Sequence, residues 1–199
     1  MSEQPFTDAA GTAPQLDLPL AFRGFQELHG QAYFDYAYTV LGDRVLAQDL
    51  VAEVFDRFAE RWDRVLTEPN PHAFAWAGLR RTVEAELARG AEHRLLIERI
   101  LFSELVHRQA QPLMTGIDAG TAGLEVGISV AAAVLELSGA KFDVIILRYL
   151  NGFSVERTAR AMGIDENTVR SLVSQAKAKI RARLAPRYLL RDTAKDDQE

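Results

Sequence analysis

Apolar residues recur along most of this chain at steps of three and four, which is the period of an amphipathic α-helix. The breaks in the pattern fall at glycine, aspartate and proline, which commonly end helices or begin turns. No segment of useful length alternates apolar and polar residues as a half-buried strand does. The pattern therefore predicts an all-α protein, with a helix ending at Gly42, helices over 46–62 and 74–87, and further helical segments over 91–110 and 124–150.

The segment 155–183 predicts two helices joined by a tight turn at Gly163, the signature of a helix-turn-helix. Ser154 and Asp165 stand at the expected N-caps of the two helices. Glycine can adopt a left-handed conformation and end the first helix. The second helix carries separate apolar and polar stripes: Val169, Leu172, Val173, Ala176, Ile180 and Leu184, against Arg170, Ser174, Lys177 and Arg181.

The order of these elements predicts two small helical domains joined by a flexible linker. The linker prediction rests on glycines and a proline in a segment without apolar periodicity. The predicted divisions are a disordered tail over 1–19, a helical domain over 20–110, a linker over 111–123, a helix-turn-helix domain over 124–191 and a charged tail over 192–199.

Charge is distributed unevenly along the chain. The net charge is −5 and the pI about 5.5, which argues against general coating of nucleic acid, so any DNA binding must come from a local patch or a partner. The segment 165–191 is such a patch, because its basic residues outnumber its two acids, Asp165 and Glu166. A basic face favours phosphate contact, since it releases counterions from DNA. The alternative interpretation is a solvated amphipathic helix in an ordinary bundle.

Several kinds of chemistry find no support in the sequence. The chain has no cysteine, and its four histidines are scattered, so we expect no disulfide, no metal site and no cofactor. We see no nucleophile–base pair or phosphate-binding glycine loop and predict that the chain is not an enzyme. No signal peptide or apolar run of ~20 residues is present, which predicts a cytoplasmic protein without membrane association.

Two segments resemble the extracytoplasmic-function (ECF) type of sigma factor, the small sigma-70 family subunits of bacterial RNA polymerase. Residues 47–55, AQDLVAEVF, are similar to the polymerase-binding helix of that family. Residues 144–154, VIILRYLNGFS, followed by Ala159, Gly163 and the run TVRS at 168–171, resemble its region 4 helix-turn-helix. The resemblance spans most of residues 22–89 and 130–184.

The resemblance implies roles for residues in the first half. Asp49 and Glu53 lie at i and i+4 on one helix face and correspond to the surface that meets the polymerase; two solvated acids are the alternative. Trp76, Arg80 and Arg81 lie on the helix corresponding to the element that captures and melts −10 promoter DNA. Aromatic rings can stack on unpaired bases and arginines can hold the backbone, although Trp76 suits a core position equally well.

The second helix of the helix-turn-helix corresponds to the reader of the −35 element. Arg170 can bond guanine or phosphate, and the lysines suit phosphate contacts that position the helix. The predicted −35 residues are Asn167, Thr168, Arg170, Ser171, Ser174, Gln175, Lys177 and Lys179.

The leading hypothesis is an alternative sigma factor whose partners are core RNA polymerase and promoter DNA, with an anti-sigma protein as a further candidate partner. One alternative is a sigma-like DNA-binding regulator without promoter melting, favoured by Glu84 and Glu86 on the third helix, because acids repel DNA phosphates. Another is a helical protein-interaction module, favoured by the acidic net charge.

Overall fold

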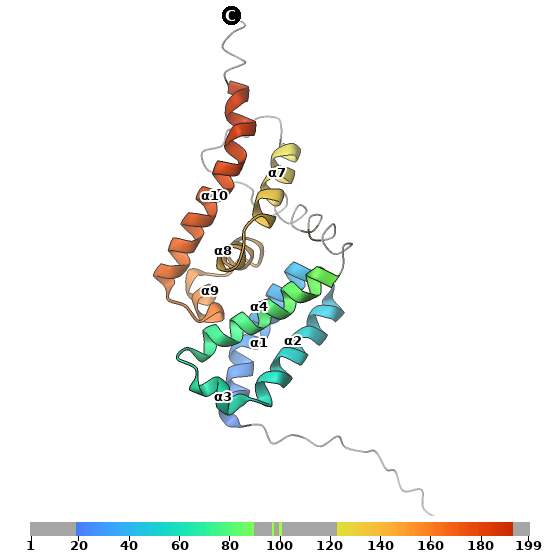
Figure 1. Ribbon diagram of the computed structural model, residues 1–199, viewed down its shortest axis with the longest axis vertical. Coiled ribbons are helices and arrows are strands. Elements are labelled where there is room, and N and C mark those ends of the chain that lie inside the picture. Colours follow the sequence, from blue (N-terminus) through green and yellow to red (C-terminus); the bar gives the residue numbers. More distant parts are fainter. Residues whose placement is uncertain (1–18, 90–96, 98–99, 101–122, 193–199) are drawn as a thin grey trace, which may run out of the picture.

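The computed structural model describes residues 19–89, 97, 100 and 123–192, and all regular structure in these residues is helical (Figure 1). The all-α prediction is therefore confirmed for them. The elements are α1 (Leu20–Leu41), α2 (Arg44–Ala59), α3 (Trp62–Thr67), α4 (Pro71–Arg89), α7 (Gly123–Leu135), α8 (Ala140–Ile145), the π-helical turn η1 (Ile146–Leu150), α9 (Val155–Met162) and α10 (Glu166–Asp192).

The first half packs α1, α2 and α4 around a core rich in aromatic rings. The break between α1 and α2 forms as predicted: Gly42 is left-handed at φ 73°, and the Asp43 carboxylate accepts from the backbone N–H groups that begin α2. The predicted helix over 46–62 is shorter than expected, because α2 ends at Ala59 and Trp62 begins α3. The bend brings the centre of the Trp62 ring to 5.1 Å from the centre of the Phe22 ring. Burial of the indole therefore stabilises the bent chain more than a continuous helix would.

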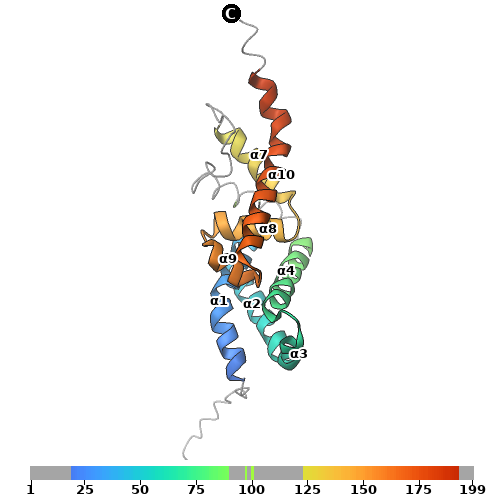
Figure 2. The ribbon, with the colours of Figure 1, turned by 90° about the vertical axis from the view of Figure 1, so that its left-hand side faces the viewer.

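The second half packs α7, α8 and α9 along the long helix α10, and η1 packs against α8 and α9 (Figure 2). Val144 to Leu147, across α8 and η1, are fully buried. The backbone N–H of Asn151 donates to the carbonyl of Ile146 at 2.9 Å, the wider spacing typical of a π turn. The predicted helix-turn-helix is present as α9 and α10.

The two halves pack against each other. Helix α9 contacts α4 and α1, and η1 contacts α1, so one continuous buried core runs through both halves. The predicted domain boundaries and linker stay predictions, because most of 90–122 lies outside the described residues, as do the tails 1–18 and 193–199. In the part of the chain that is described, no helix is long and apolar enough to cross a membrane.

Candidate nucleic-acid interface

The helix-turn-helix is built by short-range bonds at the predicted positions. Ser154 Oγ accepts from the N–H of Arg157 at 3.0 Å, and Asp165 Oδ1 accepts from the N–H of Thr168 at 2.8 Å. The bonds from Thr168 to the Asp165 carboxylate hold the pKa of that carboxyl below its usual range. Gly163 is left-handed at φ 66° and ends α9. These caps set the angle at which α10 leaves the turn.

The apolar stripe of α10 faces the core of its own half. Val169, Ala176 and Ile180 are fully buried, and Leu172 and Val173 are partly buried. The polar stripe is consequently turned to the surface, which is the arrangement that a groove-reading helix requires.

The predicted −35 residues near the start of α10 form hydrogen bonds with neighbouring side chains of the same segment. Arg170 Nη2 lies 2.6 Å from Glu166 Oε2, and its Nη1 donates to Asn167 at 3.1 Å. Gln175 donates to Ser171 Oγ at 3.1 Å. These bonds are exposed, and exposed pairs of this kind are worth less than about 1 kcal/mol, so DNA can displace them.

The basic residues farther along α10 face the rest of the C-terminal half. Lys179 Nζ donates to the Glu136 carbonyl at 3.2 Å, and Arg183 Nε lies 2.9 Å from the Glu136 carboxylate. Lys177 Nζ lies 5.0 Å from the centre of the Tyr149 ring. Glu136, which the sequence did not single out, therefore ties α10 to the end of α7. Arg181 is exposed and forms no ion pair with any of the described residues.

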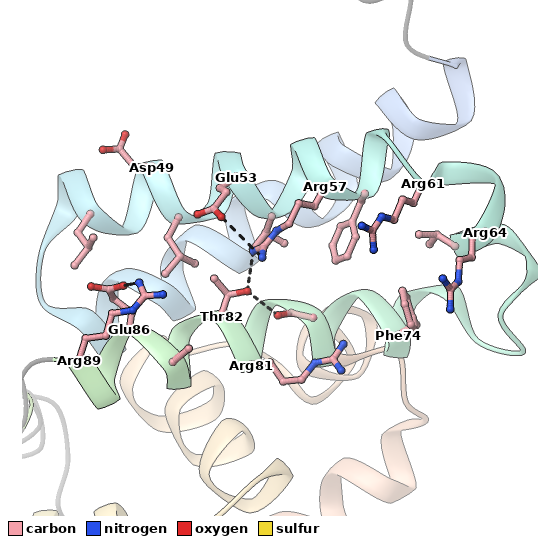
Figure 3. Close-up of a pocket in the computed structure, with 17 residues that line it drawn as sticks. Asp49, Glu53, Arg57, Arg61, Arg64, Phe74, Arg81, Thr82, Glu86 and Arg89 are labelled. Carbon is pink, nitrogen blue, oxygen red and sulfur yellow. Dashed lines mark hydrogen bonds and ion pairs between the residues drawn. The ribbon is translucent and has the colours of Figure 1, made fainter.

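The two candidate polymerase-binding acids project from the exposed side of α2. Glu53 lies 3.8 Å from Arg57 and is 66% exposed. Figure 3 shows the Asp49 carboxylate turned away from α4 and toward the outside of the molecule. Both carboxylates are thus accessible at the surface of the molecule.

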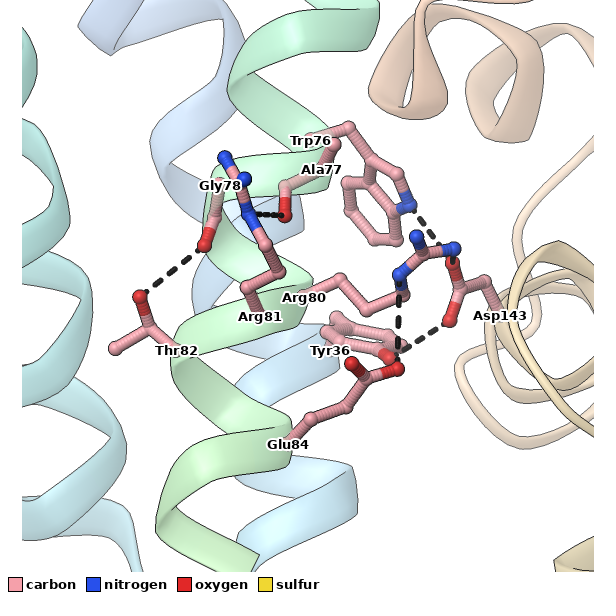
Figure 4. Close-up of polar contacts among 9 residues, drawn as sticks. All are labelled: Tyr36, Trp76, Ala77, Gly78, Arg80, Arg81, Thr82, Glu84 and Asp143. Carbon is pink, nitrogen blue, oxygen red and sulfur yellow. Dashed lines mark hydrogen bonds and ion pairs between the residues drawn. The ribbon is translucent and has the colours of Figure 1, made fainter.

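The three predicted −10 residues lie on two different faces of α4 (Figure 4). Trp76 is only 3% exposed, which matches the core interpretation, and its Nε1 donates to Asp143 Oδ2 at 2.9 Å. Arg80 points the same way, with Nη1 3.6 Å from Asp143 and Nε 3.6 Å from Glu84. Arg81 points to the opposite side, where its Nε donates to the Ala77 carbonyl at 3.2 Å.

Arg81 lies in a groove of about 700 Å³ between α2, α3 and α4 (Figure 3). Phe74, Arg61 and Arg64 line the same groove. None of Arg61, Arg64 and Arg81 forms an ion pair with a residue in the described part of the chain. The other arginines that line the groove, Arg57 and Arg89, each have an acid partner. The groove therefore offers guanidinium groups without an acid partner beside an aromatic ring, the combination that binds single-stranded nucleic acid.

Several residues around α4 were not among the predicted site residues. Arg61 and Arg64 are separated from Arg81 by the loop between α3 and α4, so no local pattern joins them. Asp143 had a visible signal, because it is a lone acid at the start of an apolar run, yet Tyr36, another of its donors, lies 107 residues away. The described residues contain no group of three His, Cys, Asp or Glu side chains that could hold a metal ion.

Residues 128–180 match the family model for sigma-70, region 4. The chain is similar to the ECF RNA polymerase sigma factor BldN of Streptomyces coelicolor, with 25% identity over 168 residues, covering 83% of this chain. It spans 61% of the length of that relative.

A solved structure is also similar: the sigma factor RpoE of Bartonella quintana, in complex with the anti-sigma factor NepR. The sequence identity is 20%, the TM-score is 0.41, and the match covers 82% of this chain and 96% of the other.

Proposed function

We propose that this chain, which belongs with the ECF-type sigma-70 family, is an alternative sigma factor that binds core RNA polymerase and directs it to promoters in the cytoplasm. The observation that carries the proposal is the region 4 match over the helix-turn-helix, preceded by a helix with the family's polymerase-binding pattern. The chain has no catalysis of its own in this role. We retain the division into a region 2-like half, a linker over 111–123 and a region 4-like half.

For polymerase binding we propose Asp49 and Glu53. Their carboxylates lie on the exposed side of α2 and carry a charge that suits a basic partner surface. Complementary charge raises the rate of encounter and fixes the register of the two surfaces.

For −35 recognition we propose the exposed beginning of α10. Arg170, Ser171, Ser174 and Gln175 have the donor groups that read base edges, and all four are exposed. Asn167 and Thr168 lie at the first turn of the helix, where phosphate is also favoured. Lys177 and Lys179 bond within the half, so their contribution to DNA binding requires a change of rotamer.

For −10 DNA we propose the groove that contains Arg81. Arg61, Arg64 and Phe74 complete a basic, partly aromatic surface that a single strand can follow. Trp76 and Arg80 contribute only where they are free of Asp143.

The direct test is reconstitution of the purified chain with core polymerase. We expect co-elution in gel filtration and specific promoter-directed transcripts. The double variant Asp49→Ala/Glu53→Ala should lose polymerase association, whereas Glu27→Ala, which removes an exposed acid from α1, should keep it. Failure of the wild-type chain to associate with polymerase would overturn the proposal.

One observation favours the alternative of a regulator without promoter melting: Trp76 is buried and bonded to Asp143. Fluorescence of 2-aminopurine placed in the −10 region separates the two functions, since unstacking of the base raises its emission. A rise on addition of the chain and polymerase supports melting, and constant emission alongside DNA binding supports the regulator.

A further inference from the structure

The contact between the two halves is built from specific polar bonds as well as apolar packing. Asn151 Nδ2 of the C-terminal half donates to Thr39 Oγ1 at 2.8 Å and to the carbonyl of Asp35 at 3.0 Å. Arg157 pairs with the Asp35 carboxylate at 3.2 Å. These bonds specify one relative position of η1 and α9 on α1.

The turn of the helix-turn-helix is part of the same contact. Asn70 Nδ2, just before α4, donates to the Gly163 carbonyl at 2.7 Å. A Cβ atom on Gly163 would lie 2.2 Å from the backbone nitrogen of Ala73, which is far inside contact distance. The turn and the beginning of α4 therefore approach as closely as glycine allows.

Asp143 lies at the centre of this contact and is completely buried. Tyr36 donates its hydroxyl to Oδ1 at 2.8 Å, Trp76 donates Nε1 to Oδ2 at 2.9 Å, and Arg80 Nη1 lies 3.6 Å from Oδ2 (Figure 4). All three groups belong to the other half. A buried carboxylate requires such partners, because without them its burial is strongly unfavourable.

The partners of Asp143 include two of the side chains predicted to hold promoter DNA. The carboxylate occupies the indole N–H of Trp76 and lies against the guanidinium of Arg80, so neither group is free to bind a nucleic acid. The same face of α4 is covered by the C-terminal half, whereas Asp49 and Glu53 on α2 stay exposed. In this packed arrangement polymerase can reach α2, but DNA cannot reach Trp76.

The packed arrangement also conflicts with simultaneous reading of two promoter elements. The −10 and −35 elements are roughly 25 base pairs apart, ~85 Å along B-form DNA at ~3.4 Å per base pair. Here α4 and the helix-turn-helix are in direct contact. Both halves can engage one promoter only after they separate.

We propose that Asp143 is an intramolecular latch: it closes the two halves on each other, withholds Trp76 and Arg80 from DNA, and is released when the chain assembles with polymerase. This inference rests on the proposed function for its DNA and polymerase steps, but closure itself is a property of the free chain. The apparent affinity for single-stranded DNA then equals the affinity of the open form multiplied by the fraction of molecules that are open.

The first test measures closure in the free chain. Because the sequence has no cysteine, Asp63→Cys on α3 and Ala132→Cys on α7, both exposed, allow a donor and an acceptor dye to be placed for energy transfer. In this labelled background, Asp143→Ala, which removes the acceptor for both Tyr36 and Trp76, should lower the transfer efficiency. Tyr36→Phe, which removes a single bond from the other side, should lower it less. The control Glu156→Gln removes an exposed acid that bonds only within α9 and should leave it unchanged.

The second test measures affinity for an oligothymidylate of about 20 nucleotides, since stacking tolerates any base. Asp143→Ala should bind it about tenfold more tightly than the wild-type chain. Adding Arg80→Gln to Asp143→Ala should remove most of that gain. On core polymerase, wild type and Asp143→Ala should show the same low transfer efficiency.

The outcomes separate the latch from the proposed function. Unchanged transfer efficiency in both Asp143→Ala and Tyr36→Phe, with both folded by circular dichroism, overturns the latch. If the halves separate without a gain in affinity for the oligonucleotide, the claim that closure keeps Trp76 and Arg80 from binding DNA is wrong. Absence of polymerase binding overturns the proposed function and leaves the result on closure intact.

Discussion

The two faces of α4 carry similar side chains in opposite surroundings. On one face Trp76 and Arg80 are covered by the C-terminal half and bonded to Asp143. On the other, Phe74 and Arg81 line an open groove with two further arginines that have no acid partner in the described residues. Arginine beside an aromatic ring suits nucleic-acid binding in both cases. The neighbouring helices decide which of the two aromatic–arginine pairs is accessible, and only an accessible pair can bind nucleic acid.

The largest difference between the faces should appear in stability. Trp76→Ala removes a buried indole and the hydrogen bond that it donates to Asp143 Oδ2, so we expect the free energy of unfolding to fall by about 3–5 kcal/mol. Phe74→Ala, at the partly buried position on the groove, should cost about 1–2 kcal/mol. Urea unfolding measures both, and similar losses for the two variants would show that the faces are equally packed.

Gly163, which packs against α4, and Gly78, which lies within α4, offer a second comparison. In Gly163→Ala the new methyl group meets the backbone of Ala73, and the residue must keep φ 66°, so we expect a loss of about 2–3 kcal/mol. In Gly78→Ala the methyl group meets only the tip of the Phe58 ring at 2.9 Å. Ring movement costs about as much as the ~1 kcal/mol gain in helix propensity, so the net change should be near zero. Thermal unfolding of the two variants checks this.

Neighbouring arginines should separate stability from DNA binding. Arg80→Ala takes the cation from a buried carboxylate and should cost about 2 kcal/mol. Arg81→Ala should change stability by less than about 0.5 kcal/mol. On the assembled polymerase, Arg81→Ala should weaken single-stranded DNA binding and lower the salt slope by about one. A stability loss for Arg81→Ala equal to that for Arg80→Ala would contradict the comparison.

The covered side should also titrate in a characteristic way. Burial, with His72 and Arg160 nearby, lowers the pKa of His29 from 6.5 to about 4, so the folded chain binds fewer protons there and loses stability as pH falls from 6.5 to 4. Burial raises the pKa of Asp143 from 3.8 to about 6, despite its bonds to Trp76 and Tyr36. Ionised Asp143 is thus disfavoured, and stability rises as pH falls from 6 to 4.

These two effects oppose each other in the wild-type chain, and single variants should separate them. Relative to wild type, Asp143→Asn should lose more stability between pH 6.5 and 4, and His29→Gln should lose less, each by on the order of 1–2 kcal/mol. Chemical unfolding at a series of pH values provides the measurement. Parallel curves for all three proteins would show that neither group titrates differently on folding.

The sequence predicted the parts of this protein that local rules determine. Ser154 and Asp165 cap helices through bonds to residues three positions ahead, and Gly163 ends α9 through its own backbone conformation. The helical periodicity also predicted which residues of α10 are buried. Because these interactions span only a few residues, their pattern is visible in the chain before it folds. The family model for sigma-70, region 4, matches residues 128–180, which include these segments.

The tertiary structure decided which of the predicted side chains are accessible. Arg80 and Arg81 are adjacent in sequence, but a helix turns about 100° per residue, so they leave α4 on different faces. Only packing determines which of those faces the second half covers. Trp76 and Asp143 are 67 residues apart, and their bond exists because α8 is placed against α4. Sequence periodicity identifies an apolar face, but the partner of that face depends on how the whole chain packs, and that geometry turns two predicted DNA contacts into the centre of an internal latch.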